Sequence, residues 1–239
     1  MRIAVVSDIH GNGAAFRAIL ADLRDASPDV ILHGGDLADG GSSPVEIVDQ
    51  IRDLGWPGVV GNTDELLFRS GSLTEFAAPI PAMGLLVPVI EAMAEWTREA
   101  LGEARLAWLN SLPPVQRHEG LALVHASPGN LWRAPAPEAT SDEMASIYGA
   151  LDMPLAIYGH IHRPFVRNLD SQTVANAGSA GLSYDGDRRA SYLIVDDGTA
   201  TIRRVEYELD RELKALAGCG IPHAGWVERM LTSARPQMP

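Results

Sequence analysis

Polar side chains of the kinds that bind metal ions follow five separate apolar runs of this chain. A short apolar run that ends in a turn is typical of a buried strand. Because the carboxyl ends of adjacent strands in an open α/β sheet meet in one crevice, residues far apart in sequence can converge there. The runs are Ile3–Val6, Val30–Leu32, Gly58–Val60, Leu121–Val124 and Leu155–Tyr158. The side chains that follow them are Asp8, His10, Asp36, Asn62, His125, His160 and His162.

The order of apolar runs and amphipathic segments predicts an α/β fold with two sheets. In the first half, helices at Ala14–Asp25 and Pro44–Leu54 separate three strands, an order that implies a mostly parallel sheet. The second half is richer in strands and predicts a further sheet packed on the first. The expected strands are 3–7, 30–35, 59–60, 121–125, 155–159, 164–168, 173–175, 191–195 and 200–206. The tail 210–231 is expected to be helical, with a break at 218–222.

The segment 81–112 interrupts the strand order and carries apolar residues at helical spacing, which predicts a helical insert. Such a stripe is typical of a face that packs against the main domain. A cap over the crevice and a dimer surface are the alternatives that the pattern leaves open.

Composition narrows the class of protein. The chain has 239 residues with 46% hydrophobic side chains and no linker-like stretch, which favours one domain over 1–239. The formal charge of −12 argues against a broad basic face for duplex nucleic acid. The single cysteine, Cys219, cannot form an internal disulfide. No apolar run has the length of a signal peptide or a membrane span, so we expect a cytoplasmic protein with no membrane partner. Homo-oligomerisation remains open.

The spacing of the seven side chains predicts a metal site. Asp8 and His10 are two residues apart, and so are His160 and His162. In an extended segment such pairs leave the same face. The donors mix nitrogen and oxygen, which suits Mn, Fe, Zn, Ni or Co better than Mg or Ca. Seven ligands exceed what one tetrahedral ion needs and suit two ions about 3.5–4 Å apart that share a carboxylate.

Other polar and aromatic residues have both a structural and a functional interpretation. Asn12 is expected to cap the helix that follows, whose amides favour an anion. Four residues could contact a phosphate, namely Asn12, Arg133, Arg163 and Arg188. In the structural interpretation, Asn12 is a helix cap and the three arginines are ordinary surface residues. Trp132 and Tyr184 could stack on a base or cover the core. His33, His118 and His223 are interpreted as structural or solvated, with His118 in a polar turn.

The ordered motifs resemble those of the calcineurin-like metallophosphoesterase superfamily. They are Asp8-Ile9-His10, Gly35-Asp36, Gly61-Asn62-Thr63-Asp64, His125 and Gly159-His160-Ile161-His162. The stretches Asp8-Ile9-His10-Gly11-Asn12, His125-Ala126-Ser127-Pro128, Asn176-Ala177-Gly178-Ser179 and Asp185-Gly186-Asp187 look like its small prokaryotic branch of diadenosine tetraphosphatase-like proteins and compact phosphodiesterases. The resemblance covers the whole chain and implies a four-layer α/β/β/α sandwich of two mixed sheets.

The resemblance also implies how the ligands divide and what they do. Asp8, His10, Asp36 and His162 would hold one ion, and Asp36, Asn62, His125 and His160 the other. The catalytic positions would be Asp36, Asn62, Thr63 and His125. A hydroxide bridging two divalent ions, with Mn first among the candidates, would attack phosphorus in line. Thr63 stands where many members of the family carry a histidine, which puts activity toward poor leaving groups in doubt.

We therefore expect a metal-dependent phosphodiesterase or phosphatase acting on a small phosphate ester or a nucleotide. The alternatives are a non-catalytic scaffold on the same fold and a regulatory protein that senses nucleotides. The seven intact ligand positions favour the enzyme. The sequence does not choose among cyclic nucleotides, dinucleoside polyphosphates, phosphoproteins and small phosphodiesters.

Overall fold

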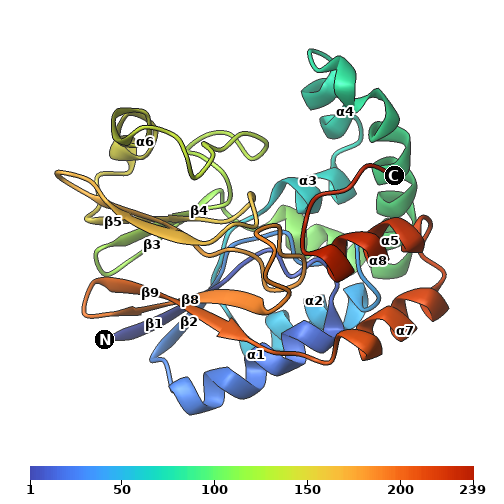
Figure 1. The fold of residues 1–239 in the computed structure, drawn as a ribbon, viewed down its shortest axis with the longest axis horizontal. Helices are drawn as coiled ribbons and strands as arrows, with labels where there is room; N and C mark the ends of the chain where they lie inside the picture. The colour runs from blue at the N-terminus through green and yellow to red at the C-terminus, as the bar shows by residue number, and fades with distance from the viewer.

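The computed structural model describes residues 1–239, in which two β-sheets pack face to face between layers of helices (Figure 1). The strands are β1 (Arg2–Val6), β2 (Val30–His33), β3 (Val115–His118), β4 (Leu121–Val124), β5 (Leu155–Tyr158), β6 (Phe165–Asn168), β7 (Thr173–Asn176), β8 (Ala190–Asp196) and β9 (Thr199–Val205). One sheet has the order β2-β1-β8-β9, and the other has the order β3-β4-β5-β7-β6. The predicted four-layer sandwich of two mixed sheets is confirmed.

Helices cover the outer face of each sheet (Figure 1). They are α1 (Gly13–Ala26), α2 (Pro44–Leu54), α3 (Asn62–Phe68), α4 (Ser72–Ala77), α5 (Val87–Asn110), α6 (Ser141–Tyr148), α7 (Leu209–Cys219) and α8 (Ala224–Ser233), with 3-10 turns η1 (Pro81–Leu85) and η2 (Gly149–Leu151). The helical tail and its break are as predicted, since α7 and α8 flank residues 220–223. None of these helices combines the length and the apolar character that crossing a bilayer requires.

Alternate side chains of a strand contribute to different hydrophobic cores, one between the two sheets and one under the helices. Side chains of a strand point to opposite faces in turn, so a strand buried on both faces serves two cores. In β1, Ala4 and Val6 join the core under the helices, whereas Ile3 and Val5 join the core between the sheets. The strand β4 behaves in the same way, with Leu121 and Leu123 between the sheets and its other two residues under α6. The apolar runs are therefore continuous because both faces are covered.

The first sheet is less parallel than the sequence suggests. Only β1 and β2 pair in parallel, while β8 pairs antiparallel to β1 and β9 antiparallel to β8. The third strand predicted at 59–60 is wrong, because that segment makes only an isolated bridge between Gly58 and His33. The chain instead turns at once into α3, which begins at Asn62. The strand β3 and the helix α6 were not predicted, since an edge strand of sequence VQRH and an eight-residue helix have weak patterns.

The helical insert predicted at 81–112 is present as η1 and α5, and α3 and α4 precede it. The helix α5 packs mainly against α3 and α2. Its buried residues Ala94, Leu101 and Leu109 belong to the core under the first sheet. The middle and C-terminal part of α5 therefore packs on the main body beside α3, whereas Val89 and Met93 near its N-terminus pack with residues of α7 and α8.

Two of the three histidines that were interpreted as structural or solvated lie on strands. His118 ends β3 rather than lying in a polar turn, and its Nε2 is buried without a partner. His33 ends β2 and is fully buried, and neither ring nitrogen has a hydrogen-bond partner. Its ring lies 6.1 Å from that of Trp108, on the helix side of the sheet. Burial lowers the pKa of His33 from 6.5 to about 3.

We expect His33 to make the protein less stable in acid. Between pH 6.5 and about 3 the unfolded chain binds a proton that the folded His33 does not, so the unfolding free energy falls as the pH falls. The slope contributed by one such group is roughly 1 kcal/mol per pH unit. The His33→Leu protein should therefore lose less stability than the wild type in urea unfolding from pH 7 down to pH 4.

His223→Asn is the matched control, because His223 is exposed and asparagine tolerates its left-handed backbone. Its pH dependence should match that of the wild type. A wild-type and a His33→Leu curve with the same slope would mean that His33 is protonated inside the fold.

Candidate metal centre

The predicted ligands other than Asn62 lie in loops that follow the strands. Five of them have a left-handed backbone conformation and not the extended conformation of a strand. The φ angles are 54° at Asp8, 49° at His10, 53° at Asp36, 65° at His160 and 55° at His162. The expectation that the two i, i+2 pairs are extended was therefore wrong. Both members of each pair still reach the centre, since Asp8, His10 and His162 share one donor set and the His160 Nδ1 lies 2.8 Å from the Asn62 Oδ1. Left-handed non-glycine residues are strained and gather at functional sites, where the surrounding fold holds them.

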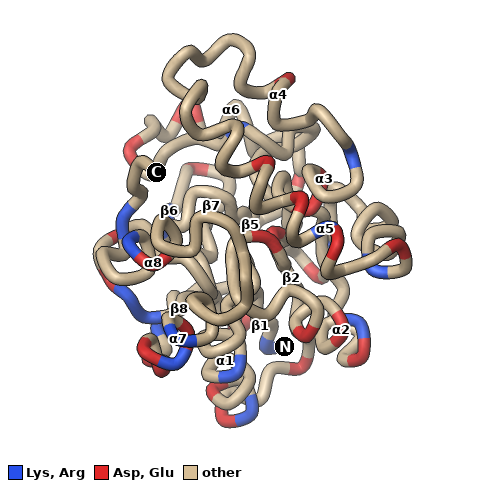
Figure 2. The backbone as a smooth tube through the Cα atoms, turned by 90° about the vertical axis from the view of Figure 1, so that its right-hand side faces the viewer, with Lys and Arg blue, Asp and Glu red and all other residues tan.

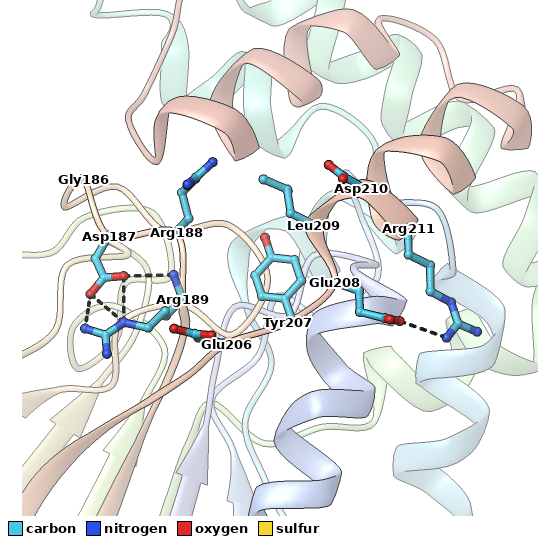
Figure 3. Close-up of a pocket in the computed structure, with 10 residues that line it drawn as sticks. All are labelled: Gly186, Asp187, Arg188, Arg189, Glu206, Tyr207, Glu208, Leu209, Asp210 and Arg211. Atoms are coloured by element: carbon cyan, nitrogen blue, oxygen red, sulfur yellow. Dashed lines mark hydrogen bonds and ion pairs between the residues drawn. The ribbon is translucent and has the colours of Figure 1, made fainter.

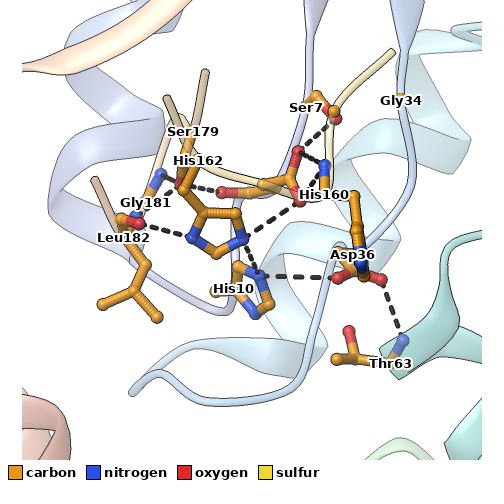
Figure 4. A network of polar contacts seen from close by, with 12 residues as sticks. Ser7, His10, Gly34, Asp36, Thr63, His160, His162, Ser179, Gly181 and Leu182 are labelled. Carbon is orange, nitrogen blue, oxygen red and sulfur yellow. Dashed lines mark hydrogen bonds and ion pairs between the residues drawn. The ribbon is translucent and has the colours of Figure 1, made fainter. Parts of the chain in front are cut away.

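Four of the predicted ligands form one compact donor set at the ends of β1, β2 and β5. One ligand atom from each of Asp8, His10, Asp36 and His162 lies within 4.8 Å of the others, and all four residues are buried. The His162 Nε2 lies 3.2 Å from the Asp8 Oδ1, and the His10 Nε2 lies 3.6 Å from the Asp36 Oδ2 (Figure 4). These side chains together can surround one ion.

The other three predicted ligands form a second donor set around the same carboxylate. The Asn62 Oδ1 lies 2.8 Å from both the His125 Nε2 and the His160 Nδ1. The His125 Nε2 also lies 3.5 Å from the Asp36 Oδ2. This oxygen of Asp36 therefore faces both sets, which is the position of a carboxylate that bridges two ions. Figure 2 looks onto the carboxyl ends of β1, β2 and β5, where acidic segments gather near the centre.

Backbone carbonyls orient three of the four imidazoles. A carbonyl oxygen only accepts, so the Nδ1 facing it carries the proton and leaves the lone pair of Nε2 directed at the centre. The carbonyls belong to Asp39 for His10, Gly34 for His125 and Leu182 for His162, at 2.8, 2.8 and 2.6 Å. The His10 and His162 Nε2 atoms consequently face each other at 3.1 Å. Two lone pairs at this distance repel unless a cation lies between them, so the residues fit a metal ion.

Hydrogen bonds also fix the two carboxylates. Asp8 accepts from the Ser7 hydroxyl at 2.5 Å and from the His160 amide at 3.0 and 3.1 Å (Figure 4). The Asp36 Oδ1 accepts from the Thr63 amide at 2.9 Å, which leaves Oδ2 free to face the imidazoles. Each carboxylate is held in one orientation before any ion binds.

Asp64 is a supporting residue that the sequence did not single out. It is fully buried, and its carboxylate accepts from the backbone amides of Asp36, Leu37 and Gly61 at 2.8–3.0 Å. It therefore ties the loop that carries Asp36 to the start of α3, which carries Asn62. Its position three residues after Gly61 in an N-terminal helical turn was the available sign of this capping role.

Burial favours the metal-binding form of two of the imidazoles, whereas at His125 the carboxylates of Asp36 and Asp8 outweigh burial and raise the pKa. Burial lowers the pKa of His10, and it lowers the pKa of His160 to about 4, with His125 adding to the effect. Burial opposes ionisation of Asp8, but the neighbouring imidazoles of His162, His125 and His10 together outweigh it and hold the pKa of Asp8 well below its usual range. Neutral imidazoles and ionised carboxylates are the forms that act as ligands.

Two of the residues proposed for phosphate contact have partners within the chain, and a third lies at a separate hollow. Asn12 is buried, and its amide group caps α1 through the Ala15 amide at 3.0 Å and donates to the Gly181 carbonyl at 2.8 Å. Arg163 forms an exposed ion pair with Glu138 at 2.5 Å. Arg188 is exposed and lines a polar hollow of about 1040 Å³ that none of the seven ligands borders (Figure 3).

The amides at the start of α1 already have an anionic partner. The sequence suggested an anion there, and the structure places the carboxylate of Glu212 from α7 at that point. It accepts from the Ala14 amide at 3.1 Å and from the Ser42 hydroxyl at 2.8 Å. The anion at this helix terminus is thus supplied by the chain itself.

The two aromatic candidates are also engaged within the fold. Trp132 stacks on Phe76 with ring centroids 5.1 Å apart and donates from Nε1 to Glu65 at 2.6 Å. Tyr184 stacks on the ring of His162 at 4.5 Å and 20°. Tyr184 therefore supports a predicted ligand directly, a role that sequence spacing does not indicate. The guanidinium of Arg133 lies over the ring of Phe76, 5.4 Å from its centroid.

Comparison with known proteins agrees with this geometry. The chain belongs to the calcineurin-like phosphoesterase superfamily, whose domain pattern matches residues 1–199. An uncharacterised protein of Methanocaldococcus jannaschii is 31% identical over 256 residues, covering 98% of both chains. The crystal structure of a metallophosphoesterase from Sphaerobacter thermophilus has 28% identity and a TM-score of 0.80, covering 98% of this chain and 99% of that one. A hypothetical protein from Pyrococcus horikoshii shares the fold, with a TM-score of 0.84 and 18% identity over 99% of each chain. The predicted superfamily is confirmed.

Proposed function

We propose that the chain hydrolyses phosphodiester or phosphoanhydride bonds of a small phosphate ester or nucleotide, with two divalent transition-metal ions, Mn first among them. The observation that carries the proposal is the position of the Asp36 Oδ2. It lies 3.6 Å from the His10 Nε2 of one donor set and 3.5 Å from the His125 Nε2 of the other. A shared carboxylate between two sets of mixed nitrogen and oxygen donors is the arrangement of a dinuclear hydrolytic centre.

The proposed ligands follow the two donor sets. Asp8, His10, Asp36 and His162 would hold one ion, and Asp36, Asn62, His125 and His160 would hold the other. When bound, the ions would polarise the phosphoryl oxygens and lower the pKa of water. Two divalent ions would carry four positive charges, and the carboxylates of Asp8 and Asp36 would neutralise only two of them. The occupied centre would therefore attract an anionic ester. The protein contributes donors that are oriented in advance.

Thr63 contacts the proposed centre without being one of its ligands. Its amide holds Asp36, and its hydroxyl is buried without a hydrogen-bond partner (Figure 4). An unpartnered hydroxyl costs free energy, which a hydrogen bond to a substrate oxygen would recover. A threonine hydroxyl can stabilise such an oxygen but is a poor acid near pH 7.

Diesters and anhydrides with good leaving groups should therefore react faster than alkyl monoesters. Without a strong acid beside the leaving oxygen, kcat/KM should depend steeply on the pKa of the leaving group. The measurement is kcat/KM for esters of graded leaving-group pKa, in the wild type and in Thr63→His. The substitution should help only the poor leaving groups, provided that the ring fits. A flat dependence in the wild type would mean that another residue donates the proton.

The proposed function itself is tested on a panel of cyclic nucleotides, dinucleoside polyphosphates, phosphodiesters and phosphomonoesters. Metal-free protein is reloaded with Mn²⁺, its metal content is measured, and release of product is followed for each ester. Turnover of a diester or anhydride that tracks the content of the second ion supports the proposal. Protein that holds two ions and hydrolyses none of the panel would contradict it and favour a scaffold or a nucleotide sensor, which binding measurements would separate.

A further inference from the structure

Two hydrogen bonds in series join the helix α5 to one of the proposed ligands. The Thr97 hydroxyl lies 2.8 Å from the Asp39 Oδ1, and the Asp39 carbonyl accepts from the His10 Nδ1 at 2.8 Å. All three residues are buried, with exposed fractions of 0% for Thr97, 4% for Asp39 and 8% for His10. The relay connects the helical insert to a side chain of the first donor set.

Thr97 occupies a position on α5 that apolar residues otherwise fill. Met93, Ala94 and Leu101 are the buried neighbours on the same helical face, at spacings of four, three and four residues. A hydroxyl in such a stripe costs free energy unless it is hydrogen-bonded. The Thr97 hydroxyl has two acceptors, the Met93 carbonyl of the same helix at 3.1 Å and the Asp39 carboxyl group at 2.8 Å. Asp39 is therefore the closer acceptor. The side chain of Thr97 thus points at the loop after β2.

Asp39 sits where its backbone decides the direction of the His10 ring. It follows Asp36 by three residues and precedes Gly40, whose φ of 107° makes the chain turn sharply at that point. Because Gly40 has no Cβ, its own backbone does not restrict this turn. The hydrogen bond from Thr97 to the side chain of Asp39 is therefore an interaction that can fix the orientation of the Asp39 carbonyl. A ligand imidazole depends on the acceptor at its far nitrogen for its tautomer and orientation.

The other oriented imidazoles have no such connection to α5. His125 is held by the carbonyl of Gly34, directly after β2, and His162 by that of Leu182. Neither carbonyl belongs to a residue bonded to the insert. The relay therefore acts on one donor set only, the one that contains His10.

We propose that Thr97 is a positioning residue for the first ion, acting through Asp39 to hold the His10 Nε2 toward the Asp36 Oδ2. The inference rests on the proposed two-metal function and adds that Thr97 of the insert, acting through His10, contributes to the affinity of one ion and not of the other. It assigns a role to a buried hydroxyl that makes no contact with either donor set.

The test compares Thr97→Val, Thr97→Ala and Thr97→Ser by isothermal titration of Mn²⁺ into metal-free protein. Serine keeps the hydroxyl and loses the methyl, whereas alanine loses both, so this pair isolates the hydroxyl even if the valine protein does not fold. Loss of a supporting partner typically costs 10- to 100-fold in metal affinity, and we expect about tenfold, at one of the two sites, in the valine and alanine proteins. The serine protein should stay within about twofold of the wild type, below the range for a lost supporting partner.

A second readout needs no metal. The His10 Nδ1 proton, observed by nitrogen-correlated NMR in metal-free protein, should exchange with water faster in Thr97→Ala than in Thr97→Ser. Unchanged affinities, or equal losses at both sites, in folded Thr97→Ala would overturn the inference and leave the proposed function standing. A wild-type protein that binds fewer than two ions would overturn both.

Discussion

An Asp36→Asn protein is expected to lose both metal occupancy and activity more completely than any other single ligand variant. Its Oδ2 faces the His10 Nε2 and the His125 Nε2, so a neutral amide there weakens both ions at once. We expect kcat/KM to fall by more than about a hundredfold, because loss of a partner one step removed from a metal already costs 10- to 100-fold in affinity or activity. The fold should persist, since asparagine can still accept from the Thr63 amide through Oδ1.

Elemental analysis and activity assays together check this expectation. Asp53→Asn, an exposed change on α2, is the matched control and should leave both quantities unchanged. His162→Ala should chiefly lower occupancy of one ion, because His162 contacts Asp8 and His10 in a single donor set. Two ions bound with wild-type affinity in Asp36→Asn would show that the bridging assignment is wrong.

Removal of metal is expected to abolish hydrolysis and to lower thermal stability. Without ions, the His10 and His162 Nε2 atoms face each other at 3.1 Å beside the carboxyl groups of Asp8 and Asp36. Turnover should drop to background with a chelator, and Mn, Ni or Co should restore it better than Mg, since four of the seven donors are imidazoles. An ion at a hundred times its Kd stabilises the folded state by about 2.7 kcal/mol, so the melting temperature should rise on reloading.

Differential scanning fluorimetry and a turnover assay on the same samples give two independent readings. Reloading with a stoichiometric amount of Mn²⁺ after removing the chelator controls for damage by the chelator. Full activity in protein shown by elemental analysis to be free of metal would refute the two-metal proposal. A rise in melting temperature without turnover would instead favour a metal-bound scaffold.

The sequence by itself singled out the side chains of the proposed centre and the class of fold that carries them. Every donor except Asn62 follows a strand whose apolar run is readable locally, because a strand buried on both faces, such as β4, has no polar position to interrupt it. The mixture of imidazole, carboxylate and amide donors is a property of residue type alone. For that reason Asp8, Asp36 and His125 could be singled out before any contact was known.

Only the tertiary structure decided how those donors are held. The left-handed backbone at Asp8 and His160, the carbonyls behind the imidazoles and the support from Asp64 depend on loops that are distant in sequence. The same holds for the antiparallel pairing of β8 with β1 and for the link from Thr97 to Asp39. Local patterns report burial and periodicity, whereas these features are set by which remote backbone group comes within hydrogen-bond distance once the sheets have packed.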